Sequence, residues 1–382
     1  MHVLLTGNTA FKIANFRQGL VRYLIAQGHR VTVLAPADDY VDALRAMGCD
    51  FVPITMNRNG TAIFEEIRLV YDIFMKIRRL KPDVVFSYTI KNNIYGGLAC
   101  RILKIPAVPN VTGLGPAFNA PGLLNRIVRV LYSVAFHKVY RVFFQNPNDL
   151  ETFVEAGLID ADRAELLPGS GVDLKAFAQT PMPTDPSERR FLLVARMLWD
   201  KGVGVFVEAA EKVRARHPDA RFQLLGSIDA ESRSGITQPQ IEEWVSSGAI
   251  EYLGVTKEVL PVLQQAHCVV LPSFYREGTP RSLLEAGAVG RPIITTDMPG
   301  CRDLVVQDRN GFLVAPQDAD DLATAMSAFL DLDPAVQAAF GAASRNLIED
   351  RYDEKIVIDA YGSIVADLAR DSASASVNGE TV

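Results

Sequence analysis

A glycine-containing loop in the second half of the chain has the composition of a phosphate-binding turn. An apolar run ends at Pro272, and a helical pattern begins near Pro280. Thr279 suits the helix N-cap, and Pro280 suits the first helical position because its missing N–H would be unpaired there. Backbone N–H groups just inside this helix, at Arg281 and Ser282, attract phosphate when the helix follows a parallel strand. The segment therefore predicts an anionic ligand.

Arg281 strengthens this interpretation, because a cation in the first turn opposes the helix dipole. A local rule broken without visible compensation is typical of a functional site. The alternative is an ion pair with Glu285, four residues further along the same helix. An acid that precedes its base is the better order for such a pair, and here the order is reversed. We favour a functional role and keep the ion pair as the alternative.

Two further cations, Arg196 and Lys201, follow an apolar run over residues 192–195 and precede Gly202. A strand, a basic loop and a helix would place both charges at the same sheet edge. Arginine offers a bidentate fork to a diphosphate, and lysine acts as a point charge. Ordinary loop basicity is the alternative. The loop after the first strand, residues 7–15, lacks GxGxxG and so lacks the usual dinucleotide fingerprint.

Two series of short apolar runs alternate with helical patterns, which predicts an α/β fold with parallel sheets. The first series has expected strands at 2–6, 29–35, 50–54 and 82–87, and expected helices at 16–27, 41–47 and 65–80. The second has expected strands at 191–195, 221–225, 250–253, 268–272 and 292–296, and expected helices at 203–214, 259–265 and 280–289. Between the series, residues 179–186 are rich in proline and predict a linker. A last helix is expected near 354–368, before a disordered tail at 371–382.

Composition limits the classes of function. The four cysteines are scattered without a CxxC pair, which predicts free thiols in a reducing compartment and no metal site. The start has no charged leader or cleavage site, so we expect a cytoplasmic protein. Residues 1–150 carry 18 Lys and Arg against 9 Asp and Glu, whereas the remainder carries 21 against 36. A basic first half suggests an anionic partner, although scattered solvated charge is the alternative.

The ordered motifs resemble those of family four retaining glycosyltransferases of the GT-B fold. Glu277 and Glu285, with seven residues between them, resemble the paired-glutamate motif of that family. The other matching segments, in chain order, are 167–173, 194–196 with 201–202, 290–294 with Gly300, and 310–312. The resemblance runs from Val3 to about Tyr361. It implies two Rossmann-like domains whose parallel sheets face each other across a cleft: an acceptor domain over 1–180, completed by a helix at about 352–370, and a donor domain over 187–351.

The resemblance also implies roles for individual residues. Arg196 and Lys201 would neutralise the donor diphosphate, and Glu285 would accept hydrogen bonds from the ribose. Glu277 would lie at the donor sugar and count with the two cations as catalytic. The remaining donor-binding positions are Gly278, Thr279, Pro280, Arg281 and Ser282. The first domain would contribute Asn15, Lys91, Thr112 and Gly113 on the acceptor or donor-sugar side. No metal and no other cofactor is expected.

The segments 110–118 and 275–281 resemble those of enzymes that extend polyprenyl-diphosphate-linked sugars of bacterial surface glycans. This subgroup implies a UDP-sugar donor, an N-acetylhexosamine or hexose as the transferred group, and a lipid-linked saccharide acceptor. Many relatives place a histidine near Thr112, and this sequence has none there. A contact with the donor sugar would then come from another group, such as the backbone near Gly113.

Two basic and apolar segments, 65–80 and 123–144, predict contact with an anionic membrane surface. The second segment is too interrupted by charge to span a bilayer. Core-packed helices with charged solvent faces are the alternative. We expect a peripheral protein on the inner face of the plasma membrane.

Two other functions stay open: an epimerase of nucleotide sugars on a related fold, and a non-catalytic nucleotide-sugar binder. The sequence shows no clustered histidines for epimerase chemistry. Nucleic acid is not expected as a partner, because basic and aromatic residues are not interleaved.

Overall fold

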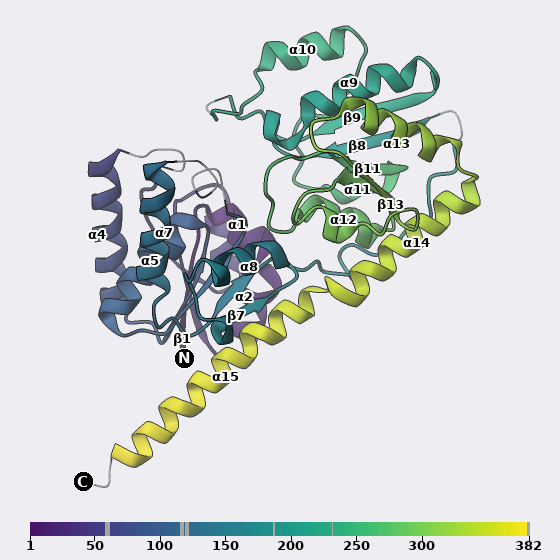
Figure 1. Cartoon of the computed structure of the whole chain (residues 1–382). Helices are drawn as coiled ribbons and strands as arrows, with labels where there is room; N and C mark the ends of the chain where they lie inside the picture. Colours follow the sequence, from purple (N-terminus) through teal and green to yellow (C-terminus); the bar gives the residue numbers. More distant parts are fainter. Residues whose placement is uncertain (58–61, 115–117, 119–121, 186–187, 231, 380–382) are drawn as a thin grey trace. The chain divides into compact units, whose positions relative to one another are not determined.

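The computed structural model describes residues 1–57, 62–114, 118, 122–185, 188–230 and 232–379, without the side chains of Leu124 and residues 375–379. The chain forms two compact units: residues 1–170 with 354–382, and residues 171–353. Each unit has its own parallel sheet with helices on both faces (Figure 1).

The boundary between the units lies after Ser170, ten residues before the expected one. The Val172 N–H donates to the Tyr352 carbonyl, and the Arg291 guanidinium donates to the Thr180 and Pro181 carbonyls. These bonds hold residues 172–181 on the second unit. The prediction of a linker at 179–186 is therefore wrong for residues 179–181, and Pro186 lies outside the described residues.

The first unit contains a seven-stranded sheet of order β3-β2-β1-β4-β5-β6-β7, in which each neighbouring pair is parallel. Its strands are β1 (His2–Thr6), β2 (Arg30–Ala35), β3 (Asp50–Pro53), β4 (Val84–Tyr88), β5 (Ala107–Val111), β6 (Val142–Phe144) and β7 (Ala164–Leu166). Its α-helices are α1 (Ala10–Phe16), α2 (Gln18–Ala26), α3 (Val41–Ala46), α4 (Ile63–Leu80), α5 (Ile90–Leu103), α7 (Leu123–Phe136), α8 (Pro147–Glu155) and α15 (Glu354–Gly379).

Successive side chains of β1 point to opposite faces of this sheet, and each face has its own core. Val3 and Leu5 pack in a core that also holds Tyr361 of α15. Leu4 packs in the other core, with residues of α4, α5 and α7. The first unit is therefore closed by a helix from the far end of the chain.

The second unit contains a six-stranded sheet of order β10-β9-β8-β11-β12-β13, again with parallel neighbours. Its strands are β8 (Arg189–Val194), β9 (Ala220–Leu225), β10 (Glu251–Tyr252), β11 (Cys268–Leu271), β12 (Ile293–Thr296) and β13 (Gly311–Val314). Its α-helices are α9 (Val203–Arg214), α10 (Gln238–Ser246), α11 (Leu260–Gln265), α12 (Arg281–Val289), α13 (Ala319–Asp331) and α14 (Pro334–Arg351). The expected strands and helices of both series are present.

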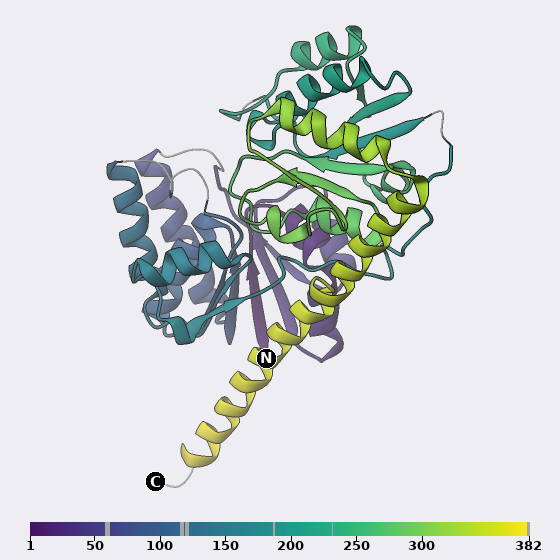
Figure 2. The ribbon, with the colours of Figure 1, turned by 45° about the vertical axis from the view of Figure 1, so that its right-hand side comes forward.

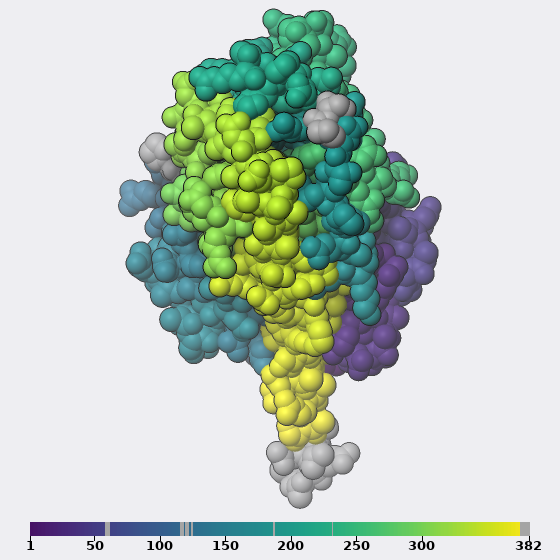
Figure 3. Space-filling view, turned by 90° about the vertical axis from the view of Figure 1, so that its right-hand side faces the viewer, coloured from purple at the N-terminus to yellow at the C-terminus, as the bar shows by residue number. Residues whose placement is uncertain are grey.

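The expected disordered tail is wrong for its described part, because α15 continues to Gly379. Residues 380–382 lie outside the described residues. Alanines and serines fill the segment 372–376, and alanine is the best helix former, so the helix can propagate from its packed part. The carboxyl-terminal end of α15 extends beyond the rest of the first unit (Figures 2 and 3).

None of the helices in the described ranges is long and apolar enough to cross a membrane. All four cysteines are buried and unpaired, as expected.

Candidate functional site

The strand order of the second unit places two loops at one point of the sheet edge. Strands β8 and β11 are neighbours, but β9 lies beyond β8 and β12 lies beyond β11. Doubly wound sheets bind ligands beyond the carboxyl ends of such a strand pair. The loop after β8 carries Arg196 and Lys201, and the loop after β11 carries Glu277. The predicted groups therefore follow the two strands at which a ligand is expected.

Gly202 lets these two loops approach each other closely. It has a φ of 73° and forms the N-cap of α9. A Cβ atom built on Gly202 would lie 2.0 Å from the carbonyl oxygen of Pro272. Only glycine fits there without a shift of the backbone. The carbonyl of Asp200 strengthens the contact by accepting the N–H groups of Phe274 at 3.1 Å and Tyr275 at 3.2 Å.

Lys201 and Glu277 form an ion pair between these loops, with Lys201 Nζ donating to Glu277 Oε1. Their side chains are 19% and 11% exposed. The hydroxyl of Ser273 donates to the same oxygen of Glu277 at 2.9 Å. The Lys201 ammonium also lies 5.7 Å from the centre of the Tyr275 ring. The structure thus brings together two residues that the sequence had placed 76 positions apart.

Arg196 lies on a more exposed side of the same edge. Its Nη1 donates to Asp229 Oδ2 at 2.8 Å, and its side chain is 58% exposed. Ion pairs this exposed contribute about 0–1 kcal/mol, so the guanidinium can exchange Asp229 for another anion at little cost. The sequence reasoning missed Asp229. Its position in the loop after β9, at the same sheet edge, was the available signal.

Arg281 and Glu285 form the ion pair that we had kept as the alternative. Arg281 Nε donates to Glu285 Oε1 at 2.7 Å, and Arg281 Nη1 donates to the Gly171 carbonyl at 2.5 Å. Burial raises the pKa of the Glu285 carboxyl, and Arg281 opposes this shift. The preference for an acid that precedes its base applies to exposed helices. Because this pair is mostly buried, that preference does not determine how much the pair contributes to stability. Arg281 therefore also fixes the start of the second unit to α12.

Helix α12 begins at Arg281, and Pro280 rather than Thr279 is its N-cap residue. The prediction was wrong by one position, because Pro280 has an extended ψ of 116°. The loop before α12 is fixed by Gly300, where a Cβ atom would lie 2.1 Å from the Gly278 carbonyl oxygen. The amino-terminal end of α12, with Ser282 in its first turn, follows β11 and so lies at the ligand edge.

In the first unit, the predicted site residues Lys91 and Asn15 bind different partners. Lys91, in the first turn of α5, donates to Glu66 Oε1 at 2.5 Å and to the Asn57 carbonyl at 2.7 Å. Asn15 is exposed on α1, and its amide donates to the Phe11 carbonyl at 2.9 Å. The structure therefore gives Lys91 an acidic partner, Glu66, which the sequence reasoning missed. Tyr95 is one helical turn after Lys91 and donates to the same carboxylate at 2.6 Å.

Thr112 and Gly113 follow directly after β5, and Gly113 has a φ of 107°. Both lie at the carboxyl edge of the first sheet, where the connections of a doubly wound fold bind ligands. Residues 115–117 of the segment 110–118 lie outside the described residues.

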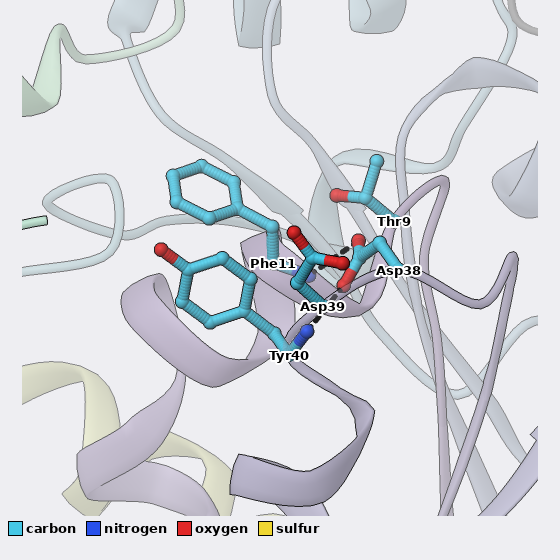
Figure 4. A pocket seen from close by; sticks show the side chains of 5 residues that line it. All are labelled: Thr9, Phe11, Asp38, Asp39 and Tyr40. Carbon is cyan, nitrogen blue, oxygen red and sulfur yellow. Dashed lines mark hydrogen bonds between the residues drawn. The ribbon is translucent and has the colours of Figure 1, made fainter. Parts of the chain in front are cut away.

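A hollow of about 270 Å³ opens between the loops after β1 and β2. It is lined by Thr9, Phe11, Asp38, Asp39 and Tyr40 (Figure 4). The Asp38 carboxylate accepts the N–H groups of Phe11 and Tyr40, each at 2.9 Å. The rings of Phe11 and Tyr40 meet edge to face with their centres 5.0 Å apart. Aromatic faces beside carboxylates are suited to a ligand with both apolar and hydroxyl surfaces, such as a sugar.

Below the carboxyl edge of the first sheet, buried asparagines join strands to α5. The Thr6 hydroxyl donates to Asn92 at 2.6 Å, and the Ser87 hydroxyl donates to Asn93 at 2.9 Å. Asn93 in turn donates to the Asn110 carbonyl at 2.8 Å. Such satisfied buried networks make the edge rigid. The sequence reasoning missed them, because no local pattern marks an asparagine as buried.

Comparison with known proteins gives two matches to family models. The model described as glycosyl transferase 4-like matches residues 2–146. The model described as glycosyl transferases group 1 matches residues 188–331. Each match covers most of one sheet and its helices.

The relatives that resemble most of the chain include two that act on diphospho-undecaprenol-linked sugars. One is the N,N'-diacetylbacillosaminyl-diphospho-undecaprenol alpha-1,3-N-acetylgalactosaminyltransferase of Campylobacter jejuni, with 28% identity over 94% of this chain and 97% of the relative. Another is the UDP-Gal:alpha-D-GlcNAc-diphosphoundecaprenol alpha-1,3-galactosyltransferase of Escherichia coli, with 26% identity over 76% of each chain. Among solved structures, Anabaena HepE in complex with UDP is similar with a TM-score of 0.77 and 18% identity, over 96% of this chain and all of that chain.

Proposed function

The chain belongs to the glycosyltransferases of the GT-B fold, and on this premise we propose that it transfers a sugar to a saccharide carried on a polyprenyl diphosphate. The observation that carries the proposal is the contact between Lys201 and Glu277. It places a cation and a carboxylate at one point beyond the carboxyl ends of β8 and β11. Two relatives that act on diphospho-undecaprenol-linked sugars support the class of acceptor.

The donor in this proposal is a nucleotide-diphosphate sugar, with UDP as the nucleotide and a hexose or N-acetylhexosamine as the sugar. Its diphosphate would lie between Lys201, Arg196 and the amino-terminal end of α12. Cations and helix N–H groups stabilise the negative charge that develops on the leaving diphosphate. The E. coli relative is named for UDP-Gal, which supports the choice of donor.

The two glutamates would have different partners. Glu277 accepts hydrogen bonds from hydroxyls of the donor sugar and stabilises positive charge at its anomeric carbon. Glu285 accepts hydrogen bonds from the ribose, and its pairing with Arg281 keeps its carboxylate directed. We propose retention of the anomeric configuration: the acceptor hydroxyl attacks from the face of the leaving group, and a phosphate oxygen takes its proton.

The acceptor saccharide would bind to the first unit. The hollow lined by Phe11, Tyr40 and Asp39 has the aromatic and carboxylate chemistry that suits a sugar. Thr112, Gly113, Lys91 and Asn15 are proposed to face the reacting sugars. Since the acceptor carries a lipid, we also propose that the reaction takes place on the inner face of the plasma membrane.

Nucleotide release from a panel of UDP-, GDP- and ADP-sugars tests the proposal, with and without a polyprenyl-diphosphate-linked saccharide in detergent. We expect release from one UDP-sugar that requires the acceptor, together with a product one sugar longer. The anomeric configuration of the new bond, read by NMR, tests retention. Release that ignores the acceptor, or an altered sugar nucleotide formed without it, would contradict the transferase proposal.

A further inference from the structure

Two helices of the first unit expose large apolar side chains along their outer faces. On α4, Phe64 is 88% exposed, Ile67 61% and Tyr71 64%. On α7, Leu123 is 72% exposed and Val130 61%. Both helices contact α5 and run alongside it on one side of the sheet (Figures 1 and 2). Such an extended apolar surface marks an interaction site, because water does not favour it.

The charges on the same faces are nearly all positive. Exposed basic residues accompany the apolar ones on α4, at the end of α5, and on and just after α7: Arg68, Arg78, Arg79, Arg101, Lys104, Arg126 and Lys138. The sequence of α7, 123–136, contains no acidic residue. On α4, Asp72 and Glu66 are partly buried in ion pairs with Lys76 and Lys91, which leaves Glu65 as its exposed carboxylate. We call the outer surface of α4 and α7, with these basic residues, the α4–α7 face.

The exposed apolar residues are unevenly distributed along the helices. Helices that connect parallel strands run opposite to them, so the amino-terminal ends of α4, α5 and α7 lie at the carboxyl edge of the sheet. On each helix the most exposed of the large apolar side chains, Phe64 on α4 and Leu123 on α7, lies at this end. Met75 and Val134, near the opposite ends, are 39% and 40% exposed. The apolar side chains are therefore most exposed at the carboxyl edge of the first sheet, where Lys91, Thr112 and Gly113 also lie.

We infer that the α4–α7 face docks on an anionic lipid bilayer, with the amino-terminal ends of α4 and α7 inserted more deeply than their carboxyl-terminal ends. Apolar side chains enter the boundary of head groups and acyl chains, and the arginines and lysines bind anionic head groups. This orientation brings the carboxyl edge of the first sheet to the membrane surface. The docking inference rests on the proposed function in one respect: a lipid-linked acceptor would reach this edge.

A hollow of about 280 Å³ at the amino-terminal end of α4 is consistent with this orientation. It is lined by Ile63, Ile67 and Val70, with Glu66 beside them. Glu66 is the carboxylate that binds Lys91 and Tyr95. The apolar side of this hollow thus belongs to the α4–α7 face, and its polar side is the carboxylate that binds the first turns of α5.

Co-sedimentation with vesicles tests the docking, and the vesicles contain neither donor nor acceptor. We expect the full chain to bind phosphatidylglycerol-containing vesicles and to bind neutral phosphatidylcholine vesicles weakly. Ile127→Asp should lower binding at least about tenfold, since it puts a charge into the apolar boundary. Val245→Asp is the matched control, because Val245 on α10 is 43% exposed and Ile127 is 45% exposed. Equal binding by the two variants would overturn the inference.

The charges are tested with Arg68→Gln and Arg79→Gln, each expected to lower binding to anionic vesicles about fivefold and to leave binding to neutral vesicles unchanged. Gel filtration excludes a different occupant. If the wild-type chain is a dimer that Ile127→Asp converts to a monomer, with vesicle binding intact, the face joins two copies and the inference fails.

Site-specific labels test the orientation. All four native cysteines are buried, so an added surface cysteine can be labelled selectively with an environment-sensitive fluorophore. Labels at Phe64→Cys and Leu123→Cys should gain more emission on vesicle binding than labels at Met75→Cys and Val134→Cys. A label at Val245→Cys should not respond. Equal gains along both helices would refute the deeper insertion of the amino-terminal ends. Because no sugar transfer is measured, a failure here is distinguishable from a failure of the proposed activity.

Discussion

At the scale of single residues, Lys201 is a cation with two distinct partners: it pairs with Glu277 and is proposed to bind the donor diphosphate. We expect Lys201→Ala to lower kcat by about 10²–10³, the usual cost of removing one group that stabilises developing charge. The melting temperature should change far less. Lys212→Ala is the control, since Lys212 also forms ion pairs, with Glu208 and Asp320, on the outside of α9. A normal turnover rate in Lys201→Ala would remove this lysine from the mechanism.

His267 is a second residue whose environment has a measurable consequence. Burial, with Arg190 and Arg291 nearby, lowers the pKa of His267 from 6.5 to about 4. Between these values the unfolded chain binds a proton that the folded protein does not. Stability is therefore fully present above pH 6.5 and falls as the pH drops towards 4. Urea unfolding at pH 7 and at pH 5 measures this effect. The free energy of unfolding should fall less between these pH values in His267→Gln than in the wild type. The exposed His137→Gln should behave like the wild type.

At the scale of elements, the turn between β8 and α9 depends on the absence of one side chain. Gly202→Ala would place a Cβ 2.0 Å from the Pro272 carbonyl oxygen at a φ of 73°. Gly254→Ala is the matched control, with a φ of 72° and no atom within 4 Å of the added Cβ. We expect Gly254→Ala to cost about 1 kcal/mol of unfolding free energy, from backbone strain alone. Gly202→Ala should cost at least about 3 kcal/mol and also lower activity, since the loop must move away from β11. Chemical denaturation of both variants compares the costs.

At the scale of the whole molecule, the chain passes between the two units twice, after Ser170 and after Asp353. Residues 171–353 are therefore continuous, and they contain Arg196, Lys201 and Glu285. We expect this segment, produced alone, to fold cooperatively and to bind UDP in calorimetry. Residues 1–170 alone should not fold, because they lack Tyr361. The ring of Tyr361 is fully buried, and its centre lies 4.7 Å from that of Phe86. Cooperative unfolding of 1–170 without α15 would contradict this account.

The sequence by itself determined the elements and much of the chemistry. Apolar runs and helical periodicity are local, so strands such as β8 and helices such as α9 were predicted to within a few residues. The sequence also predicted that Glu277 lies in the loop after β11 and that Arg196 and Lys201 lie between β8 and α9, because turn-forming residues are a local signal. The predicted start of α12 was one residue too early, since a proline can occupy either the N-cap or the first helical position.

Only the tertiary structure decided which of these groups meet. Lys201 pairs with Glu277 across 76 residues, and Arg196 pairs with Asp229 across 33 residues. Arg291 binds Thr180 across 111 residues and so assigns the expected linker to the second unit. None of these pairs has a local signature, because each depends on which loops the strand order brings to one edge. The tertiary structure also decided which side chains are exposed. Periodicity identified α4 and α7 as amphipathic, but only the packing showed that Phe64 and Leu123 on their outer faces are exposed.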